Sequence, residues 1–231
     1  MYFRHSHITA LPHHVQQAEG WLHKSDGGTK TAALSYAALE LRYAIERLAV
    51  YYWVSLLNRP LTHAEAETLG TYKKLERRIY DLAGHQKAID GNFAFLRAVM
   101  GVMKIPNELP TPNLGRLSEH WHACSEICHV AWPLSCSVEL YRQATFEQLT
   151  EIQKNLVPLV SSNMIGWPVI HEKGFAELRD RFVAGHASAA EIQEYANMHG
   201  LWARVHDKDD RQIRFIGEAI PPRTPSPRDD A

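Results

Sequence analysis

The amino-acid sequence predicts a mainly α-helical protein: a helical bundle of five to six helices with a small C-terminal α+β appendage. Two observations predict this fold class. Apolar residues recur at helical spacing through most of the first 165 residues, and capping sequences, prolines and glycines separate the apolar stretches. The chain has 231 residues, 45% of them hydrophobic, which is enough to bury a sizeable core.

The first long helix is predicted over residues 29–57. Leu41, Ile45, Leu48 and Tyr52 follow one another at spacings of four, three and four residues, so they share one face of that helix. Arg42 and Glu46 lie beside this stripe at i,i+4 spacing, which favours an ion pair at the rim of the core.

The next helix is predicted to begin at a capping box, Thr62 to Glu65, and to end near Gly84. A second capping box, Ser188 to Glu191, begins a short helix that ends at Gly200. The other elements predicted by pattern are helices over residues 87–103, 113–131, 137–161 and 174–184, and two short strands over 201–206 and 212–216.

The chain is expected to divide into three parts. Residues 1–165 form the helical bundle domain, and residues 166–220 form a small α+β unit of two short helices and a β-hairpin. The last part, residues 221–231, is rich in proline and charge and holds too little apolar material to fold, so we expect a disordered tail.

Composition excludes several classes of function. The net charge of -1 and the pI of about 6.9 give no general attraction to nucleic acid or to anionic membranes, so either would need a local basic patch. No apolar segment is long enough to cross a bilayer, and the N-terminus lacks the apolar centre of a signal peptide. Three cysteines clustered late in the chain do not suggest a disulfide framework. We therefore expect a cytoplasmic protein without membrane contact.

Sequence motifs of the common nucleotide-dependent and serine-hydrolase enzymes are absent as well. The chain has no phosphate-binding glycine loop, nucleophile elbow or dinucleotide fingerprint, and no cofactor is expected. Five of the 14 histidines lie within the first 23 residues. This favours an ordinary polar N-terminal segment, with a weak metal-binding arm as the alternative.

Residues 116–129, RLSEHWHACSEICH, hold the strongest candidates for chemistry. On a helix they separate into two stripes, one with Arg116, His120, Cys124 and Cys128 and the other, roughly opposite, with His122, Ser125 and His129. The soft ligands of the first stripe would spread over about 12 Å, too far for one ion. We therefore expect Cys124 and Cys128 to be buried core cysteines, with no metal site. The alternative is a zinc site that uses His120, Cys124 and Cys128.

Arg116 and His122 together supply a cation for an anionic phosphorane and a group that moves protons near neutral pH. Metal-independent RNA cleavage needs little more, because the 2′-hydroxyl of the substrate is the nucleophile. His129, at the end of the same helix, is the other histidine that could take this role.

A helical bundle that carries an arginine followed four to six residues later by a histidine resembles the HEPN superfamily. RLSEHWH fits that spacing, and the stretch from Ala38 to Ala49 resembles the first long helix of bacterial proteins of this helical type. The resemblance covers residues 28–162. Leu117 departs from the polar residue that often follows the arginine in active members.

The resemblance implies a helical RNase of a bacterial toxin–antitoxin or phage-defence system. It also implies a homodimer in which two protomers bring their motifs together. His122 would be the general acid or base, and Arg116 would stabilise the phosphate and the transition state.

A basic set adds a candidate RNA-binding surface. Lys73, Lys74, Arg77 and Arg78 fall at helical spacing with one acidic residue, Glu76, among them. Such a set can hold RNA phosphates, although it also fits a solvated helix face.

The alternative function is a non-catalytic interaction or regulatory subunit. In that case the histidine-rich helix would lie at an interface with a protein partner, and Arg116 would pair with Glu119 at i,i+3.

Overall fold

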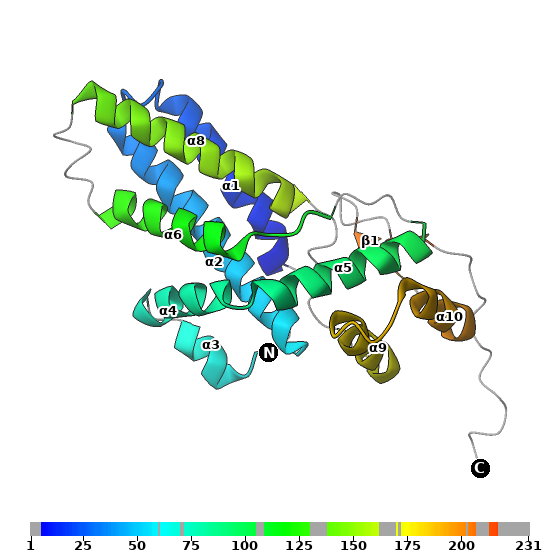
Figure 1. Cartoon of the computed structure of the whole chain (residues 1–231). Coiled ribbons are helices and arrows are strands. Elements are labelled where there is room, and N and C mark those ends of the chain that lie inside the picture. Colours follow the sequence, from blue (N-terminus) through cyan, green and yellow to red (C-terminus); the bar gives the residue numbers. More distant parts are fainter. Residues whose placement is uncertain are drawn as a thin grey trace, which may run out of the picture.

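The computed structural model describes residues 6–59, 61–69, 72–104, 109–129, 138–161, 170, 172–201, 203–206 and 213–216. Within them the protein is mainly helical, which confirms the predicted class (Figure 1). The helices are α1 (Ser6–Lys24), α2 (Thr31–Leu57), α3 (His63–Leu69), α4 (Tyr72–Ala83), α5 (Gln86–Val102), α6 (Leu114–His129), α8 (Glu139–Ser161), α9 (Lys173–Val183) and α10 (Ala189–His199). None of these helices is both long and apolar enough to cross a bilayer.

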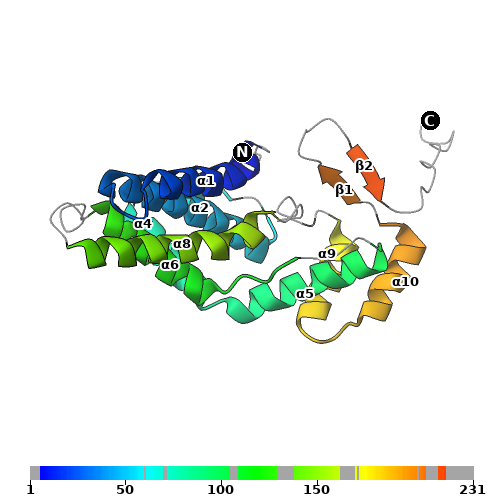
Figure 2. The same cartoon turned by 90° about the horizontal axis from the view of Figure 1, so that it is seen from above.

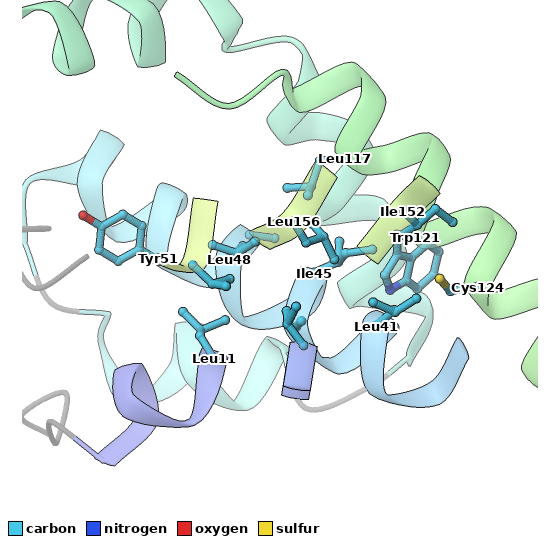
Figure 3. Packing of buried hydrophobic residues seen from close by; sticks show 14 of the residues in the cluster. Leu11, Leu41, Ile45, Leu48, Tyr51, Leu117, Trp121, Cys124, Ile152 and Leu156 are labelled. Atoms are coloured by element: carbon cyan, nitrogen blue, oxygen red, sulfur yellow. The ribbon is translucent and has the colours of Figure 1, made fainter. Parts of the chain in front are cut away.

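Four helices, α1, α2, α6 and α8, lie side by side in one block (Figures 1 and 2). Helix α2 is central, because it packs against each of the other three. Its predicted inward stripe is confirmed: Leu41, Ile45, Leu48 and Tyr52 are all buried. Figure 3 shows several of these side chains among those of α1, α6 and α8.

The pattern predicts no helix before residue 29, whereas the structure has α1 from Ser6, and the expectation of an ordinary polar N-terminal segment is wrong where α1 enters the core. Leu11, Val15, Ala18 and Leu22 are buried and belong to the main core. Their spacings of four, three and four residues repeat the pattern of α2. The surrounding histidines and Pro12, which lies inside α1, obscure this stripe in the sequence.

The single helix predicted between Thr62 and Gly84 is instead two helices, α3 and α4. The predicted capping box is present, because the Thr62 N–H donates to Glu65 Oε2 at 2.8 Å and the Glu65 N–H donates to Thr62 Oγ1 at 3.3 Å. The sequence places Gly70 between the two helices, and glycine has a low helix propensity.

Helix α5 has two apolar faces. One face contributes to the main core through Ile89, Phe93, Leu96 and Met100. The other carries Phe95 and Val99, which pack in a second, smaller core with Phe175 and Leu178 of α9 and Ile192 of α10. Figure 2 shows α5 leading from the four-helix block to α9 and α10.

The C-terminal capping box is confirmed, since the Ser188 N–H donates to Glu191 Oε1 at 3.1 Å. Helix α10 ends at His199, and Gly200 follows as its C-cap, close to the predicted end, with a φ of 72° that favours glycine. Strands β1 (Ala203–His206) and β2 (Ile213–Ile216) pair antiparallel. The tail predicted for residues 221–231 lies outside the described residues, and the division at residue 166 stays a prediction.

Candidate functional site

The candidate site is built on α6, whose start is fixed by two side chains. Asn113 Oδ1 accepts a hydrogen bond from the Arg116 N–H at 2.9 Å, and Gln86 Oε1 of α5 accepts one from the Leu114 N–H at 2.7 Å. These acceptors satisfy amides that have no partner within the helix. The Gln86 contact also ties the start of α6 to the start of α5.

The inward face of α6 is apolar. Leu117, Trp121 and Cys124 are buried in the main core, and Cys128 is partly buried with its Sγ 4.0 Å from the Ser35 carbonyl oxygen of α2. Burial raises the pKa of the Cys128 thiol to about 11 and raises the pKa of Cys124 as well. Both residues are therefore neutral thiols near pH 7, and Cys124 is confirmed as a core cysteine.

The metal alternative gains no support from this arrangement. In the part of the chain that the structure describes, no three side chains of the His, Cys, Asp or Glu type gather as ligands for one ion.

Arg116 lies on the flank of α6 that faces α8. Its guanidinium donates to Glu151 of α8 at 2.5 Å, and its side chain is about half exposed. The partner suggested by sequence spacing, Glu119, is not the one observed in this ion pair. Glu151 lies 35 residues away in sequence, so spacing along α6 alone does not reveal it.

His120 lies one turn after Arg116, on the same flank. Its Nε2 lies 3.5 Å from Asn155 Nδ2 of α8. Partial burial lowers the pKa of His120, and the neighbouring Arg116 charge lowers it further, with Glu151 and Glu119 opposing. The folded protein therefore favours the neutral imidazole.

This lowered pKa leads to a testable pH dependence. The unfolded chain binds a proton at His120 more readily than the folded chain, so protonation favours unfolding as the pH falls through about 6.5. We expect His120→Gln to remove part of the loss of stability between about pH 7.5 and about pH 5.5, measured by urea unfolding. His186→Gln, at an exposed histidine, is the control and should keep the full loss. An equal loss in both variants would contradict the assignment.

His122 lies on the other flank of α6, beside α4. Its Nδ1 is 3.4 Å from the Tyr80 hydroxyl of α4, and its Nε2 is 3.2 Å from Glu126 Oε1. The His122 side chain is 53% exposed, so both ring nitrogens stand close to solvent as well as to these partners. This is an accessible histidine whose ring is held at both nitrogens.

Arg116 and His122 do not converge within one chain. Six residues of helix separate them by about 120° around the axis and about 9 Å along it. One of them pairs with α8 and the other contacts α4. The exposed Glu119 and Glu126 lie on the outer face of α6.

The predicted cations lie on α4, the helix that contacts His122. Arg77 is 85% exposed and only loosely paired, 4.0 Å from Asp81. Arg78 is exposed and its guanidinium stacks over the Trp53 ring of α2, 5.4 Å from the ring centroid. The side chains of Lys73 and Lys74, like that of His129, lie outside the described residues.

Two polar contacts join α2 to its neighbours. The predicted ion pair within α2 is confirmed, with Arg42 Nε 2.8 Å from Glu46 Oε1. The first contact starts from this pair, because Glu46 Oε1 also accepts the indole N–H of Trp121 of α6 at 3.1 Å. His14 of α1 pairs with Glu40 of α2 at 2.6 Å. His14 therefore contributes to the packing of α1 against α2.

Comparison of the chain with protein-family models, with curated proteins and with solved structures finds no match. The HEPN resemblance therefore rests on the sequence pattern alone.

Proposed function

We propose that this chain is a HEPN-like RNA-binding protein and a metal-independent endoribonuclease that acts as a homodimer. The observation that carries this proposal is the contact between Tyr80 and His122. It joins the candidate acid–base residue on α6 to α4, the helix that carries the candidate phosphate-binding cations. The HEPN resemblance would place the protein in a bacterial toxin or defence system.

In the proposed reaction the 2′-oxygen of a ribose attacks the neighbouring phosphorus, and the bond from phosphorus to the 5′-oxygen breaks. A base removes the proton of the 2′-hydroxyl, and an acid gives a proton to the leaving 5′-oxygen. His122 supplies one of these proton transfers. Water can supply the other.

The developing negative charge on the phosphorane needs a cation. Arg77 is an exposed cation on α4, and the proposal assigns Arg116 to a second copy, because in its own chain Arg116 lies on the other flank of α6. The dimer is therefore part of the proposal and not an additional feature of it.

The direct test is cleavage of total RNA by the purified chain in EDTA. We expect cleavage, and we expect His122→Ala to slow it by about a hundredfold or more, as for loss of an acid–base group. His63→Ala is a matched control, because His63 pairs with Glu67 at i,i+4 as His122 pairs with Glu126. It should leave cleavage unchanged.

A shared site can be tested by mixing two inactive variants. If Arg116 and His122 act from different copies, then Arg116→Ala mixed with His122→Ala regains activity in hybrid dimers, each of which has one complete site. No cleavage by the unaltered chain, or equal cleavage by His122→Ala and His63→Ala, would remove the ribonuclease proposal.

A second candidate function is a non-catalytic interaction subunit. The observation that favours it is the start of α8, where Val138, Leu140 and Tyr141 expose 73%, 77% and 47% of their surface. Neighbouring exposed apolar side chains often mark protein interfaces. This candidate is supported if the chain cleaves no RNA and native mass measurement shows a complex that Leu140→Asp dissociates without loss of helicity. It is contradicted if the chain stays monomeric and binds no partner.

A further inference from the structure

We infer that the surface where α4 meets α6 binds single-stranded RNA, with one unpaired base stacked on the ring of Tyr80. This inference rests on the proposed RNA-binding function and specifies the substrate class. Nothing in the pattern of residues 116–129 points to Tyr80. Its hydroxyl lies beside His122 because α4 packs against α6.

The first support is the state of the Tyr80 ring. Its neighbours in α4, Ile79 and Leu82, are buried in the main core, whereas Tyr80 is 46% exposed. The hydroxyl end of the ring lies 3.4 Å from His122 Nδ1. An aromatic ring held at one end and open to solvent can accept a base without first being ordered, which reduces the entropic cost of binding.

The second support is a cation at the correct spacing. Arg77 precedes Tyr80 by three residues, so the two side chains are neighbours on the surface of α4. The Arg77 side chain is 85% exposed, and its contact with Asp81 is long, at 4.0 Å. The guanidinium can therefore turn towards a phosphate of an RNA strand while a base of that strand stacks on the ring of Tyr80.

The third support is the difference between the two flanks of α4. On the other flank, Arg78 stacks over Trp53, whose indole N–H donates to the Arg78 carbonyl oxygen at 3.1 Å. His85 contacts the same indole edge-on, with ring centroids 5.3 Å apart. That aromatic ring already has partners of its own chain, so Tyr80 is the better platform for a base.

The substrate class follows from how rings recognise RNA. In an A-form duplex the bases are stacked on each other, and the deep, narrow major groove admits no side chain. A single strand has bases that can turn outward and stack on an aromatic ring beside a cation. A helix surface with one open tyrosine and an adjacent arginine therefore fits a single strand and not a duplex.

The test is fluorescence anisotropy of the 231-residue chain with a labelled mixed-sequence single-stranded RNA and with a blunt duplex of the same sequence. We expect tighter binding to the single strand. We expect Tyr80→Ala to weaken that binding by about tenfold, as for loss of one stacked base, and Tyr80→Phe to stay within about twofold. Arg77→Ala should weaken binding to all sequences and reduce the salt dependence by about one released counterion.

Tyr43→Ala is the matched control, because Tyr43 of α2 is 42% exposed and its ring, like that of Tyr80, lies beside a histidine, His14. It should bind RNA as the unaltered chain does. Circular dichroism of each variant shows whether it has kept its helices. Unchanged RNA binding by Tyr80→Phe supports the inference only if Tyr80→Ala binds the RNA more weakly.

The outcomes separate this inference from the function on which it rests. If the unaltered chain binds neither RNA, the proposed RNA-binding function fails. If it binds RNA but Tyr80→Ala behaves like Tyr43→Ala, the stacking site is overturned and RNA binding stands. Binding of the duplex at least as tightly as the single strand also overturns the substrate class.

Discussion

Replacing Trp121 by alanine is expected to lower the free energy of unfolding by about 3–5 kcal/mol, the largest effect of any single core substitution in α6. Trp121 has no exposed surface and is among the largest fully buried side chains of the described residues. Its ring lies in the same cluster as Leu41 of α2 and Ile152 of α8, shown together in Figure 3. Its removal would leave a cavity where three helices meet.

The comparison with Trp121→Phe separates packing from hydrogen bonding. Phenylalanine fills most of the space but cannot donate the indole N–H that Glu46 accepts at 3.1 Å, so we expect a smaller loss, about 1–2 kcal/mol. Urea unfolding followed by circular dichroism measures both variants. A loss of less than about 1 kcal/mol for Trp121→Ala would contradict the packing described for α6.

The second large effect is expected at Gly28, in the connection between α1 and α2. Its φ of +98° is unfavourable for residues with a side chain, and an added Cβ would stand 2.7 Å from the Arg142 carbonyl oxygen of α8. That oxygen belongs to helix backbone and cannot turn away. Backbone strain and overpacking together should make Gly28→Ala less stable by about 2–5 kcal/mol in urea unfolding.

Gly27 provides the matched control, because it has a φ of +63° and no atom within 4 Å of an added Cβ. Gly27→Ala should therefore cost only about 1–2 kcal/mol, the penalty of the left-handed backbone. If Gly28→Ala proves no less stable than Gly27→Ala, the close approach of this connection to α8 is wrong.

Much of the fold could be predicted from the sequence because local signals agree with packing. The buried stripe of α2 follows from its spacing, and the caps at Thr62 and Ser188 follow from their residue types. Helix α1 has an equally regular stripe, from Leu11 to Leu22, but Pro12 and the histidines around it favour a different interpretation. The break between α3 and α4 is not evident from the pattern, because a single glycine such as Gly70 is tolerated within a helical pattern.

The candidate site could be predicted only in part. Helix geometry correctly places Arg116 and His122 on different sides of α6, but it cannot say which helix faces each side. The partners Glu151 and Tyr80 lie 35 and 42 residues away along the chain. Contacts of that range depend on how α8 and α4 pack against α6, which no spacing within residues 116–129 reveals.

Because α5 contributes one apolar face to each of the two cores, it affects how the protein unfolds. Phe93 and Phe95 are two residues apart, yet they belong to different cores. Opening either core exposes one side of α5 to water and weakens the support of the other. The four-helix block and the α9–α10 pair should therefore unfold as one cooperative unit, and a chain cut after residue 161 would carry an uncovered strip at Phe95 and Val99 that invites aggregation.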